Sequence, residues 1–206
     1  ATSTADTVDQ FVFPVSIEAK NNLLPEFLKK EGPERTIVFM RTKHRADSCC
    51  RRLERKGIKA AAIHGNRSQA QRERALSAFR DGTVDVLVAT DVLARGIDIS
   101  DVRYVVNFDV PAEPTDYIHR IGRTGRAGNQ GTAITFISGA ELRRFNWMMR
   151  DIKADIKRET LPSPQDIVAM KRAKIKDDLQ EIVANESYGD YADIAAELLE
   201  SYAPDV

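Results

Sequence analysis

Three arginines lie close together beside glycines in the stretch from His119 to Arg126. They occupy positions 120, 123 and 126. Cations at this spacing repel one another unless an anion lies nearby, and the guanidinium fork matches the oxygens of a phosphate group. The stretch therefore predicts a phosphate clamp. A solvated basic turn is the alternative interpretation, because most short arginine clusters are of that kind.

A second segment, residues 89–98, favours the phosphate interpretation. Thr90 follows an apolar run and offers a hydroxyl and a backbone N–H to a phosphate, while Gly96 allows a ligand to approach the backbone closely. Asp98 can accept a hydrogen bond from a ribose hydroxyl. The alternative is that Asp91 and Asp98 are only turn and capping residues.

Polar residues also follow two other apolar runs. Thr42 comes directly after one run, next to Arg41 and Lys43. Arg72 lies in the first turns of a predicted helix that Ser68 can cap, where the helix end carries a partial positive charge. Both places suit a nucleic-acid phosphate.

Several other kinds of site are excluded. The glycines at 122, 125, 128 and 131 precede a predicted strand, whereas a dinucleotide fingerprint must follow a strand and open a helix. None of the eleven glycines is followed by Lys, so the chain has no P-loop, and no acidic pair suited to Mg²⁺ follows a strand. His44 and His64 lack companions at metal-ligand spacing, so we assign no metal site. We expect the chain to touch a nucleotide without binding or hydrolysing it unaided.

Short β-branched runs alternate with amphipathic stretches along most of the chain, which is typical of strand–helix units around a parallel sheet. The predicted strands cover residues 10–15, 36–40, 59–63, 84–89, 104–108 and 132–137. The predicted helices cover about 18–30, 44–56, 68–80, 114–122 and 140–153. In open α/β sheets ligands collect at the carboxyl ends of the strands, and the segments above all lie there.

The pattern changes after Thr160. The Leu161-Pro-Ser-Pro164 stretch cannot continue a helix, and no strand pattern follows it. We therefore expect an α/β domain over residues 1–161 and a small α-helical appendage over 162–206. The appendage carries an apolar stripe at helical spacing that must dock on the main domain or on another chain.

The net charge of zero conceals an uneven distribution. Residues 35–150 hold 21 Lys and Arg against 12 Asp and Glu, a net of +9, whereas residues 161–206 hold 4 against 10, a net of −6. The middle of the chain should attract polyanions.

The cysteines and the apolar runs indicate the cellular compartment of the protein. Cys49 and Cys50 are neighbours in a helical pattern, so a disulfide between them is sterically disfavoured and a reducing, cytoplasmic setting follows. No apolar run approaches the roughly 20 residues that span a bilayer, and no signal peptide is present, so we expect no membrane partner. The chain starts at Ala1 rather than Met, which we interpret as a fragment of a longer polypeptide.

Taken together, these segments resemble the DEAD-box ATP-dependent RNA helicases, specifically their second RecA-like domain, of three layers around a mostly parallel sheet. The resemblance covers about residues 8–155. The motifs that carry it, in the family's order, are Ile37-Val-Phe-Met-Arg-Thr42, Gln69-Ala-Gln-Arg72, residues 89–99, Val106-Asn-Phe-Asp-Val-Pro111 and His119 to Arg126.

The resemblance implies roles for individual residues. Asp98 and Gly96 belong to the ATP site at the ribose, and Arg123 and Arg126 reach the terminal phosphate, with Arg126 as the arginine finger. The positions implied to hold the RNA sugar-phosphate backbone are Thr42, Gly65, Arg72 and Thr90. The positions implied to couple two domains are Arg95, His119 and Arg120.

The resemblance also implies an N-terminal RecA-like domain that carries the P-loop and the Mg²⁺ ligands. ATP with Mg²⁺ and single-stranded RNA would bind across the cleft between the two domains, and cleft closure would unwind a short RNA duplex locally. By its position, the segment 162–206 is similar to helical dimerisation modules of some bacterial members, which implies a homodimer. Two other hypotheses stay open: an RNA-binding module without nucleotide chemistry, and one half of a DNA helicase.

Overall fold

The computed structural model describes residues 8–91, 99, 102–125, 130–152 and 157–158, together with the isolated residues 172, 175, 176 and 180. The chain divides into two compact units, Ala1–Leu161 and Pro162–Val206. Almost all of the described residues belong to the first unit. The predicted helical appendage at 162–206 lies outside the described residues apart from the four isolated positions, so it stays a prediction.

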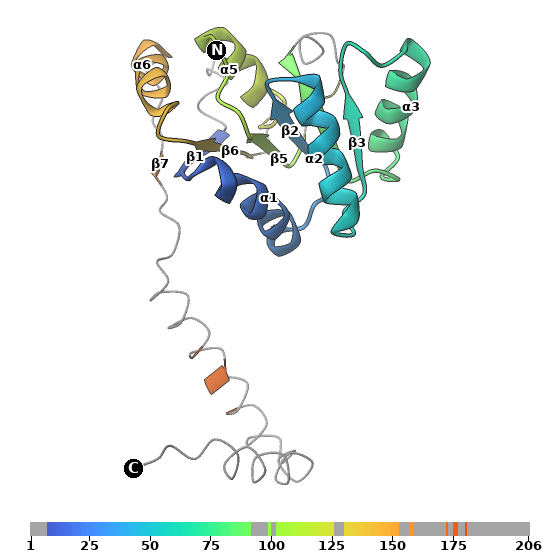
Figure 1. The fold of residues 1–206 in the computed structure, drawn as a ribbon, viewed down its shortest axis with the longest axis horizontal. Coiled ribbons are helices and arrows are strands. Elements are labelled where there is room, and N and C mark those ends of the chain that lie inside the picture. Colours follow the sequence, from blue (N-terminus) through green and yellow to red (C-terminus); the bar gives the residue numbers. More distant parts are fainter. Residues whose placement is uncertain are drawn as a thin grey trace. The chain divides into compact units, whose positions relative to one another are not determined.

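The described part of the first unit alternates strands with helices, as predicted (Figure 1). The strands are β1 Val8–Pro14, β2 Thr36–Met40, β3 Ala60–Ile63, β4 Val86–Thr90, β5 Tyr104–Asn107, β6 Gly131–Ile137 and β7 Lys157–Arg158. The helices are α1 Ile17–Glu31, α2 Lys43–Arg55, α3 Gln69–Arg80, α5 Pro114–Ile121 and α6 Leu142–Ile152.

The strands form one sheet in the order β3-β4-β2-β5-β6-β1-β7. Each of the strand pairs that the described residues form is parallel. All five residues of β2 and all five of β4 are buried, because central strands of a parallel sheet are covered on both faces. The prediction of an α/β fold around a parallel sheet is confirmed.

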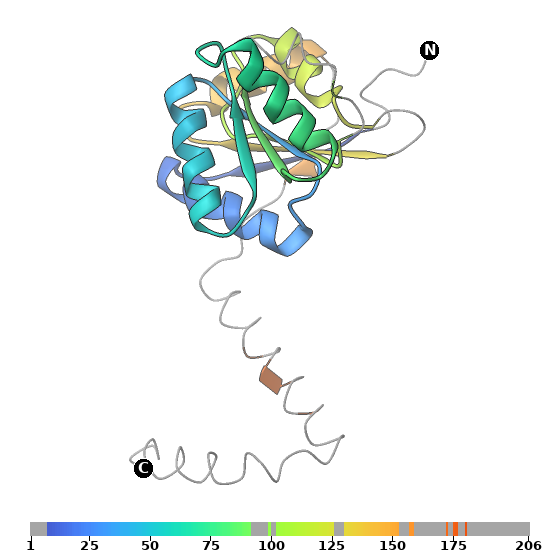
Figure 2. The same ribbon diagram turned by 90° about the vertical axis from the view of Figure 1, so that its right-hand side faces the viewer.

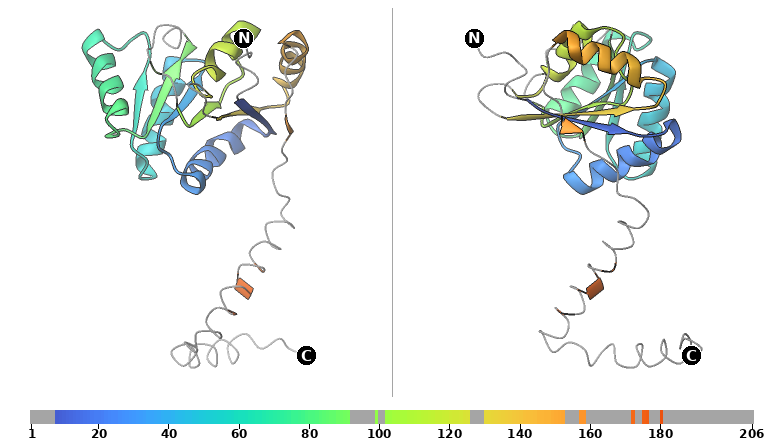
Figure 3. Two further views of the ribbon diagram at one scale, coloured as in Figure 1. Left: turned by 180° about the vertical axis from the view of Figure 1, so that it is seen from behind. Right: turned by 90° about the vertical axis from the view of Figure 1, so that its left-hand side faces the viewer.

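Helices cover both faces of the sheet and create two cores (Figures 2 and 3). On one face Leu28 of α1 and Leu53 of α2 pack with Val38 and Val88. On the other face residues of α3, α5 and α6 pack with the alternate side chains of the same strands; they include Phe79, Tyr117, Phe145, Ile37 and Leu87. This alternation follows from the two-residue period of a strand.

Helices α1, α2 and α3 each begin at a capping hydroxyl. The side chain of Ser16 accepts a hydrogen bond from Ala19 N at 3.1 Å, and that of Thr42 accepts one from Arg45 N at 3.3 Å. Ser68 forms a capping box with Gln71, which confirms the predicted cap. These caps fix where the strand-to-helix loops turn at the end of β2 and before α3.

Several details differ from the sequence prediction. Strand β4 begins at Val86 rather than at Val84, and helix α5 ends at Ile121 rather than at residue 122. Strand β7 was not predicted, because its two charged residues carry no alternating pattern; Lys157 and Arg158 pair with Phe11 and Val12 of β1.

Cys49 and Cys50 are both buried free thiols of α2. Burial raises the pKa of Cys49 to about 12 and that of Cys50 to about 11. Both therefore stay protonated at neutral pH and act as core residues. Among the described residues, no helix has the length and apolar character needed to cross a membrane.

Candidate functional site

Three neighbouring strands of the sheet end at one edge, which we call the carboxyl edge. Strands β3, β4 and β2 are adjacent and parallel, so the residues that follow them lie in one row. Gly65 follows β3, Thr90 ends β4 and Thr42 follows β2. Gly65 and Thr42 are exposed, and Thr90 is 7% exposed. The row thus brings together three of the residues that the resemblance assigns to RNA.

Arg72, the fourth of these residues, lies in the second turn of α3. Its side chain is half-buried, and its Nε is buried without a hydrogen-bond partner in the described part of the chain. A buried guanidinium nitrogen without a partner costs free energy unless a ligand satisfies it. The N-terminal end of α3 therefore presents a cation that is suited to an anionic ligand.

The loop that carries Gly65 is held by a buried, hydrogen-bonded histidine. His64 is 3% exposed, and its Nε2 lies 2.8 Å from Oδ1 of Asp47 on α2. The same oxygen accepts a hydrogen bond from Nη2 of Arg67 at 2.9 Å. Burial acts to raise the pKa of Asp47, but His64 and Arg67 outweigh it, and the pKa is lowered. This anchor fixes the turn on which Gly65 lies.

Arg120 is a buried scaffold residue. It is 1% exposed, and its Nε and Nη2 donate to the two carboxylate oxygens of Asp91 at 2.6 and 2.7 Å. Its Nη1 donates to Asn107 Oδ1 at 3.2 Å and to the Asp109 carbonyl at 2.7 Å, and the guanidinium lies 5.1 Å from the ring centroid of Phe39. Arg120 therefore ties the ends of β4 and β5 to α5.

This burial changes how Arg120 could take part in coupling two domains. The guanidinium is turned inward and its bonds are made within this domain, so any effect on a second domain would pass through Asp91 and the loops that it holds. His119, the neighbouring residue, is exposed and free of this constraint. The predicted coupling roles of both residues stay predictions.

The arginine-rich turn begins where α5 ends. The spacings of four and three residues would place His119, Arg123 and Arg126 on one face if the turn were helical, but α5 stops at Ile121 and Arg123 lies beyond it. Arg123 Nη1 donates to the Ile99 carbonyl at 3.4 Å. Arg126 lies outside the described residues, as do Arg95, Gly96 and Asp98.

Gly131 holds the start of β6 against this turn. A Cβ atom at Gly131 would overlap Gly125 N and the side chain of Thr124. Gly125 itself has φ of 68°, in the left-handed region that favours glycine. Two glycines of the series thus serve the close approach of β6 and the turn.

Asp109 anchors the loop after β2. This residue is 1% exposed, and its Oδ2 accepts a hydrogen bond from Arg41 N at 2.8 Å while Oδ1 lies 3.0 Å from Arg45 Nη1. Sequence reasoning missed this role, although an acidic residue directly after a buried strand was the available signal. Asp109 fixes the backbone next to Thr42.

Glu141 joins four segments at the carboxyl edge. Its Oε2 accepts hydrogen bonds from Lys20 Nζ at 2.7 Å and from Ser138 N at 3.0 Å, and its Oε1 accepts one from Val110 N at 3.3 Å. Nη2 of Arg41 lies 3.5 Å from the same Oε1. The Lys20 side chain is 2% exposed and that of Glu141 is 12% exposed, so this is a buried ion pair.

Replacing Glu141 with glutamine should lower the free energy of unfolding by about 3 kcal/mol at pH 7, because it leaves the Lys20 charge buried and unpaired. Burial acts to raise the pKa of Glu141, but the bonds from Lys20 and Ser138 outweigh it and lower the pKa from 4.5 to about 2. A lowered folded-state pKa gives stability that is present above the unfolded pKa and is lost as pH falls. Urea unfolding at several pH values should show the difference between wild type and Glu141→Gln constant above pH ~5 and shrinking towards pH ~2. A difference that does not depend on pH would contradict this account.

Among the described residues, no group of three His, Cys, Asp or Glu side chains could hold a metal ion. The carboxylates described above at this edge are each paired with an arginine or a lysine, and the hydroxyl, backbone and guanidinium groups beside them are of the kinds that recognise phosphate.

The chain is similar to known proteins. Residues 19–128 match the family model of the helicase conserved C-terminal domain. The chain is 41% identical over 199 residues to the ATP-dependent RNA helicase CshA of Listeria monocytogenes, covering 97% of this chain and 38% of the relative. The chain therefore spans well under half the length of that relative.

Solved structures are similar as well. A DEAD box protein from Methanococcus jannaschii has a TM-score of 0.72 and 36% identity over 76% of this chain and 43% of its own. The S. cerevisiae protein Dbp5, solved with RNA and ADP BeF3, has a TM-score of 0.71 and 32% identity over 84% of this chain and 47% of its own.

Proposed function

This chain belongs to the DEAD-box RNA helicase family as its helicase conserved C-terminal domain, and from that premise we propose that it forms one half of a cleft that binds ATP and RNA. The other half would be an N-terminal RecA-like domain that carries the P-loop and the Mg²⁺ ligands. The observation that carries the proposal is the row of Gly65, Thr90 and Thr42 at the carboxyl edge, with Arg72 on α3.

The row is suited to the backbone of a nucleic acid rather than to its bases. Exposed hydroxyl and backbone groups at Thr42 and Gly65, with one guanidinium at Arg72, recognise phosphate and sugar. Such contacts carry no sequence information, so the domain would act on RNA of many sequences. The solved Dbp5 complex with RNA and ADP BeF3 is a relative in which both ligands are bound.

The ATP half-site would lie beside this row. Asp98 would accept a hydrogen bond from the ribose, Gly96 would let the nucleotide approach the backbone, and Arg123 and Arg126 would contact the terminal phosphate. Arg126 is the proposed arginine finger. Its guanidinium would stabilise negative charge that develops on the transferred phosphoryl group, and Mg²⁺ held by the other domain would add charge stabilisation when bound.

Closure of the cleft would separate the strands of a short RNA duplex. In the closed state this domain would hold one RNA strand along the Gly65 to Thr42 row in a bent path, which a duplex cannot follow, so that a short duplex separates locally. Hydrolysis would remove the phosphate contacts of Arg123 and Arg126, and the cleft would reopen. His119 and Arg95 would contact the other domain, and Arg120 would position the loops that do so.

Three further expectations belong to the same proposal. The isolated chain would be inactive as an ATPase, since it has no Gly-Lys dipeptide from which to build a P-loop. The segment 162–206 would mediate homodimerisation. The protein would act in the cytoplasm, with buried reduced thiols at Cys49 and Cys50.

A hybrid helicase tests the proposed function directly. In this hybrid the present chain replaces the matching C-terminal part of Listeria monocytogenes CshA, so that the P-loop domain comes from the relative. We expect ATPase activity that single-stranded RNA stimulates, and none from this chain alone. RNA binding without any ATPase in the hybrid would favour the second candidate, an RNA-binding module without nucleotide chemistry.

Arg72→Ala in the hybrid helicase should weaken binding of single-stranded RNA about tenfold, because one charge-assisted contact to phosphate is lost. The slope of log K against log salt should become shallower by ~0.7, the value for one phosphate contact on a single strand. Fluorescence anisotropy with a labelled RNA, in the presence of ADP BeF3 and at several salt concentrations, measures both. Arg80→Ala, at the exposed end of the same helix, is the matched control. An unchanged slope in Arg72→Ala would remove Arg72 from the RNA site.

A further inference from the structure

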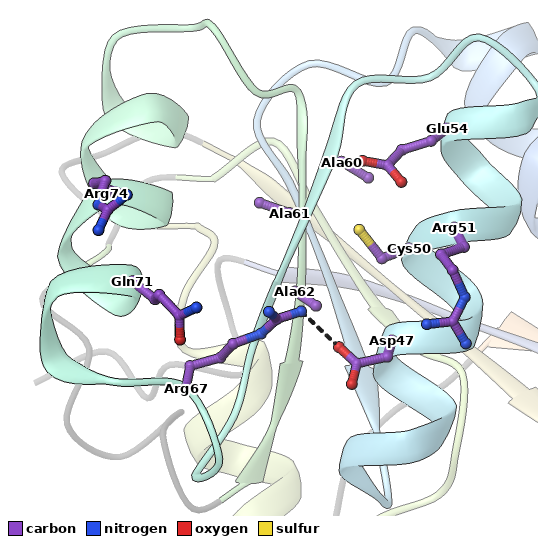
Figure 4. Close-up of a pocket in the computed structure, with 10 residues that line it drawn as sticks. All are labelled: Asp47, Cys50, Arg51, Glu54, Ala60, Ala61, Ala62, Arg67, Gln71 and Arg74. Atoms are coloured by element: carbon purple, nitrogen blue, oxygen red, sulfur yellow. Dashed lines mark hydrogen bonds and ion pairs between the residues drawn. The ribbon is translucent and has the colours of Figure 1, made fainter.

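Strand β3 forms one edge of the sheet, and one of its sides is unpaired in the described structure. The strand is the first in the sheet order and pairs with β4 alone. An edge strand presents a row of backbone N–H and C=O groups that another strand can bind. The row on β3 lies between α2 and α3, which flank it on the two faces of the sheet (Figure 4).

The alternation of the strand identifies which groups face outward. The Lys59 carbonyl accepts a hydrogen bond from Val86 N of β4 at 3.1 Å. In a parallel strand the backbone groups of alternate residues point to the same side. Lys59 and Ala61 therefore bond to β4, and the N–H and C=O groups of Ala60 and Ala62 point to the unpaired edge.

The space beside this edge is a pocket rather than packed protein. A pocket of about 350 Å³ is lined by β3 and by side chains of α2 and α3 (Figure 4). A second pocket of about 400 Å³ adjoins it at Ala60 and Glu54 and continues past Lys59 to Gly57. Together they follow β3 from Ala60 to Ala62, and we call them the β3 groove.

The residues of β3 keep the groove open. Three successive alanines, Ala60, Ala61 and Ala62, form its floor. Alanine is disfavoured in strands compared with β-branched residues, and Ala60 and Ala62 are themselves buried, at 7% and 9% exposed. The small side chains of the run leave space for the pocket beside the backbone. Protected edge strands more often carry inward-pointing charges, a proline or a bulge, and the four residues of β3 have no charge or proline.

Charges on the two walls select the kind of ligand. Arg51 on α2 and Arg74 on α3 line the groove on opposite sides, and both are exposed. Neither guanidinium has an ion pair among the described residues. Arg67, by contrast, is neutralised by Asp47 at 2.9 Å. Each of the two walls of the groove therefore carries a cation without an ion pair in the described part of the chain, and Glu54 also lines the α2 wall.

We propose that the β3 groove binds an extended acidic peptide of a partner protein, which adds to the sheet as a strand beside β3. Main-chain hydrogen bonds to Ala60 and Ala62 would supply the affinity, as in other cases of strand addition. Neighbouring side chains of a bound strand point to opposite faces, so two consecutive acidic residues would reach Arg51 and Arg74 at once.

Two other occupants fit less well. RNA has no backbone N–H to pair with a strand edge, and the proposed RNA row lies at the strand ends rather than along the side of β3. Pairing of β3 with β3 of a second copy would bring the unpaired cations Arg51 and Arg74 of two copies together, which repels them. The β3 groove is lined by residues of this chain alone, and peptide binding there would not require ATP.

A pair of synthetic peptides tests the proposal on this chain. The probe is a capped peptide of sequence TVTEETVT, and the control carries KK in place of EE. We expect saturable binding of the probe in calorimetry, with slowed exchange of the Ala60 and Ala62 amide protons in NMR, and at least tenfold weaker binding of the control. No saturable binding up to ~1 mM probe, which corresponds to about −4 kcal/mol, would overturn the proposal. Equal binding of both peptides would also overturn the proposal, because the arginines of the groove would then not select an acidic ligand.

Variants of the chain and of the peptide test strand addition itself. Arg51→Ala and Arg74→Ala should each weaken binding about three- to fivefold, as expected for exposed charge pairs, with Arg150→Ala on α6 as the control. Ala62→Pro should abolish binding, since it removes an N–H that faces the groove and not the sheet.

If Ala62→Pro does not fold, the peptide supplies the same test. N-methylation of one alternating set of probe nitrogens should abolish binding, and N-methylation of the other set should leave it within about threefold. The same effect from both sets would overturn strand addition. Competition by single-stranded RNA, or dimerisation that the probe disrupts, would assign the groove to RNA or to a second copy instead.

Discussion

Arg126→Ala in the hybrid helicase is expected to lower the kcat of RNA-stimulated ATP hydrolysis by roughly 10³-fold or more, the range of effects seen for arginine fingers in related phosphoryl transfer. The physical reason is that the guanidinium acts on charge present in the transition state and not in bound ATP, so kcat and kcat/KM should fall together while KM changes little. Steady-state ATPase assays at saturating RNA measure these constants.

The control for this prediction is Arg143→Ala, which removes an exposed arginine of α6. It should leave kcat within twofold, and both variants should keep the wild-type melting temperature. An Arg126→Ala variant with a kcat within threefold of wild type would refute the finger assignment. Arg123→Ala would then be the next variant to assay, because the resemblance implies that it contacts the same phosphate.

Arg120→Ala has the largest expected effect on stability. Its loss removes two hydrogen bonds to Asp91, one to Asn107 and one to the Asp109 carbonyl, and leaves the Asp91 carboxylate without its partner. Breaking a buried pair in this way costs about 3–5 kcal/mol. We expect a lower urea midpoint with an unchanged slope, which distinguishes lost stability from a change in the unfolded state.

Arg120→Lys separates charge from geometry. Lysine keeps the charge but cannot form the bidentate contact or lie flat against Phe39, so it should recover only part of the loss. Arg103→Ala is the control, because that side chain is 52% exposed and lies 3.9 Å from Glu34, so it should change stability by less than about 1 kcal/mol. A loss of under ~1 kcal/mol in Arg120→Ala would show that the buried network adds little stability.

The strands and helices of the fold could be predicted from the sequence, whereas the long-range interactions between their side chains could not. Thr36–Met40 was predicted to the residue, because a short, almost wholly apolar run bounded by polar residues is typical of a buried strand. Helix α3 was placed to within one residue, because Ser68 is a residue type that favours the N-cap position. Strand β7 carried no such signal, since two residues are too short for a period.

Arg120 could not be placed correctly from residue spacing. Its spacing from Arg123 and Arg126 indicated that all three belong to one phosphate clamp. Arg120 is instead buried against Asp91, which lies 29 residues away in sequence and meets it only through the order of the strands. The same holds for Lys20 and Glu141, which are 121 residues apart. Residue type and spacing located the carboxyl edge correctly, whereas the long-range ion pairs that fix it required the fold.

Ion pairs connect the site to the rest of the domain. Three carboxylates each pair with an arginine or a lysine and hold a loop of the carboxyl edge; they are Asp91, Asp109 and Glu141. These carboxylates neutralise Arg120, Arg45 and Lys20, so that the cationic groups left over, such as Arg72, stay available for phosphate. A scaffold of paired charges thus surrounds a smaller set that is suited to ligands.

The central claim is that guanidinium groups of this domain complete an ATP site whose other walls belong to a second domain. A crystal structure of the hybrid helicase with RNA and ADP BeF3 tests it most directly. We expect the Arg126 guanidinium to lie at hydrogen-bonding distance, about 3 Å, from the beryllium fluoride group. An Arg126 side chain turned to solvent in that closed state, with no arginine of this domain at the phosphates, would contradict the claim.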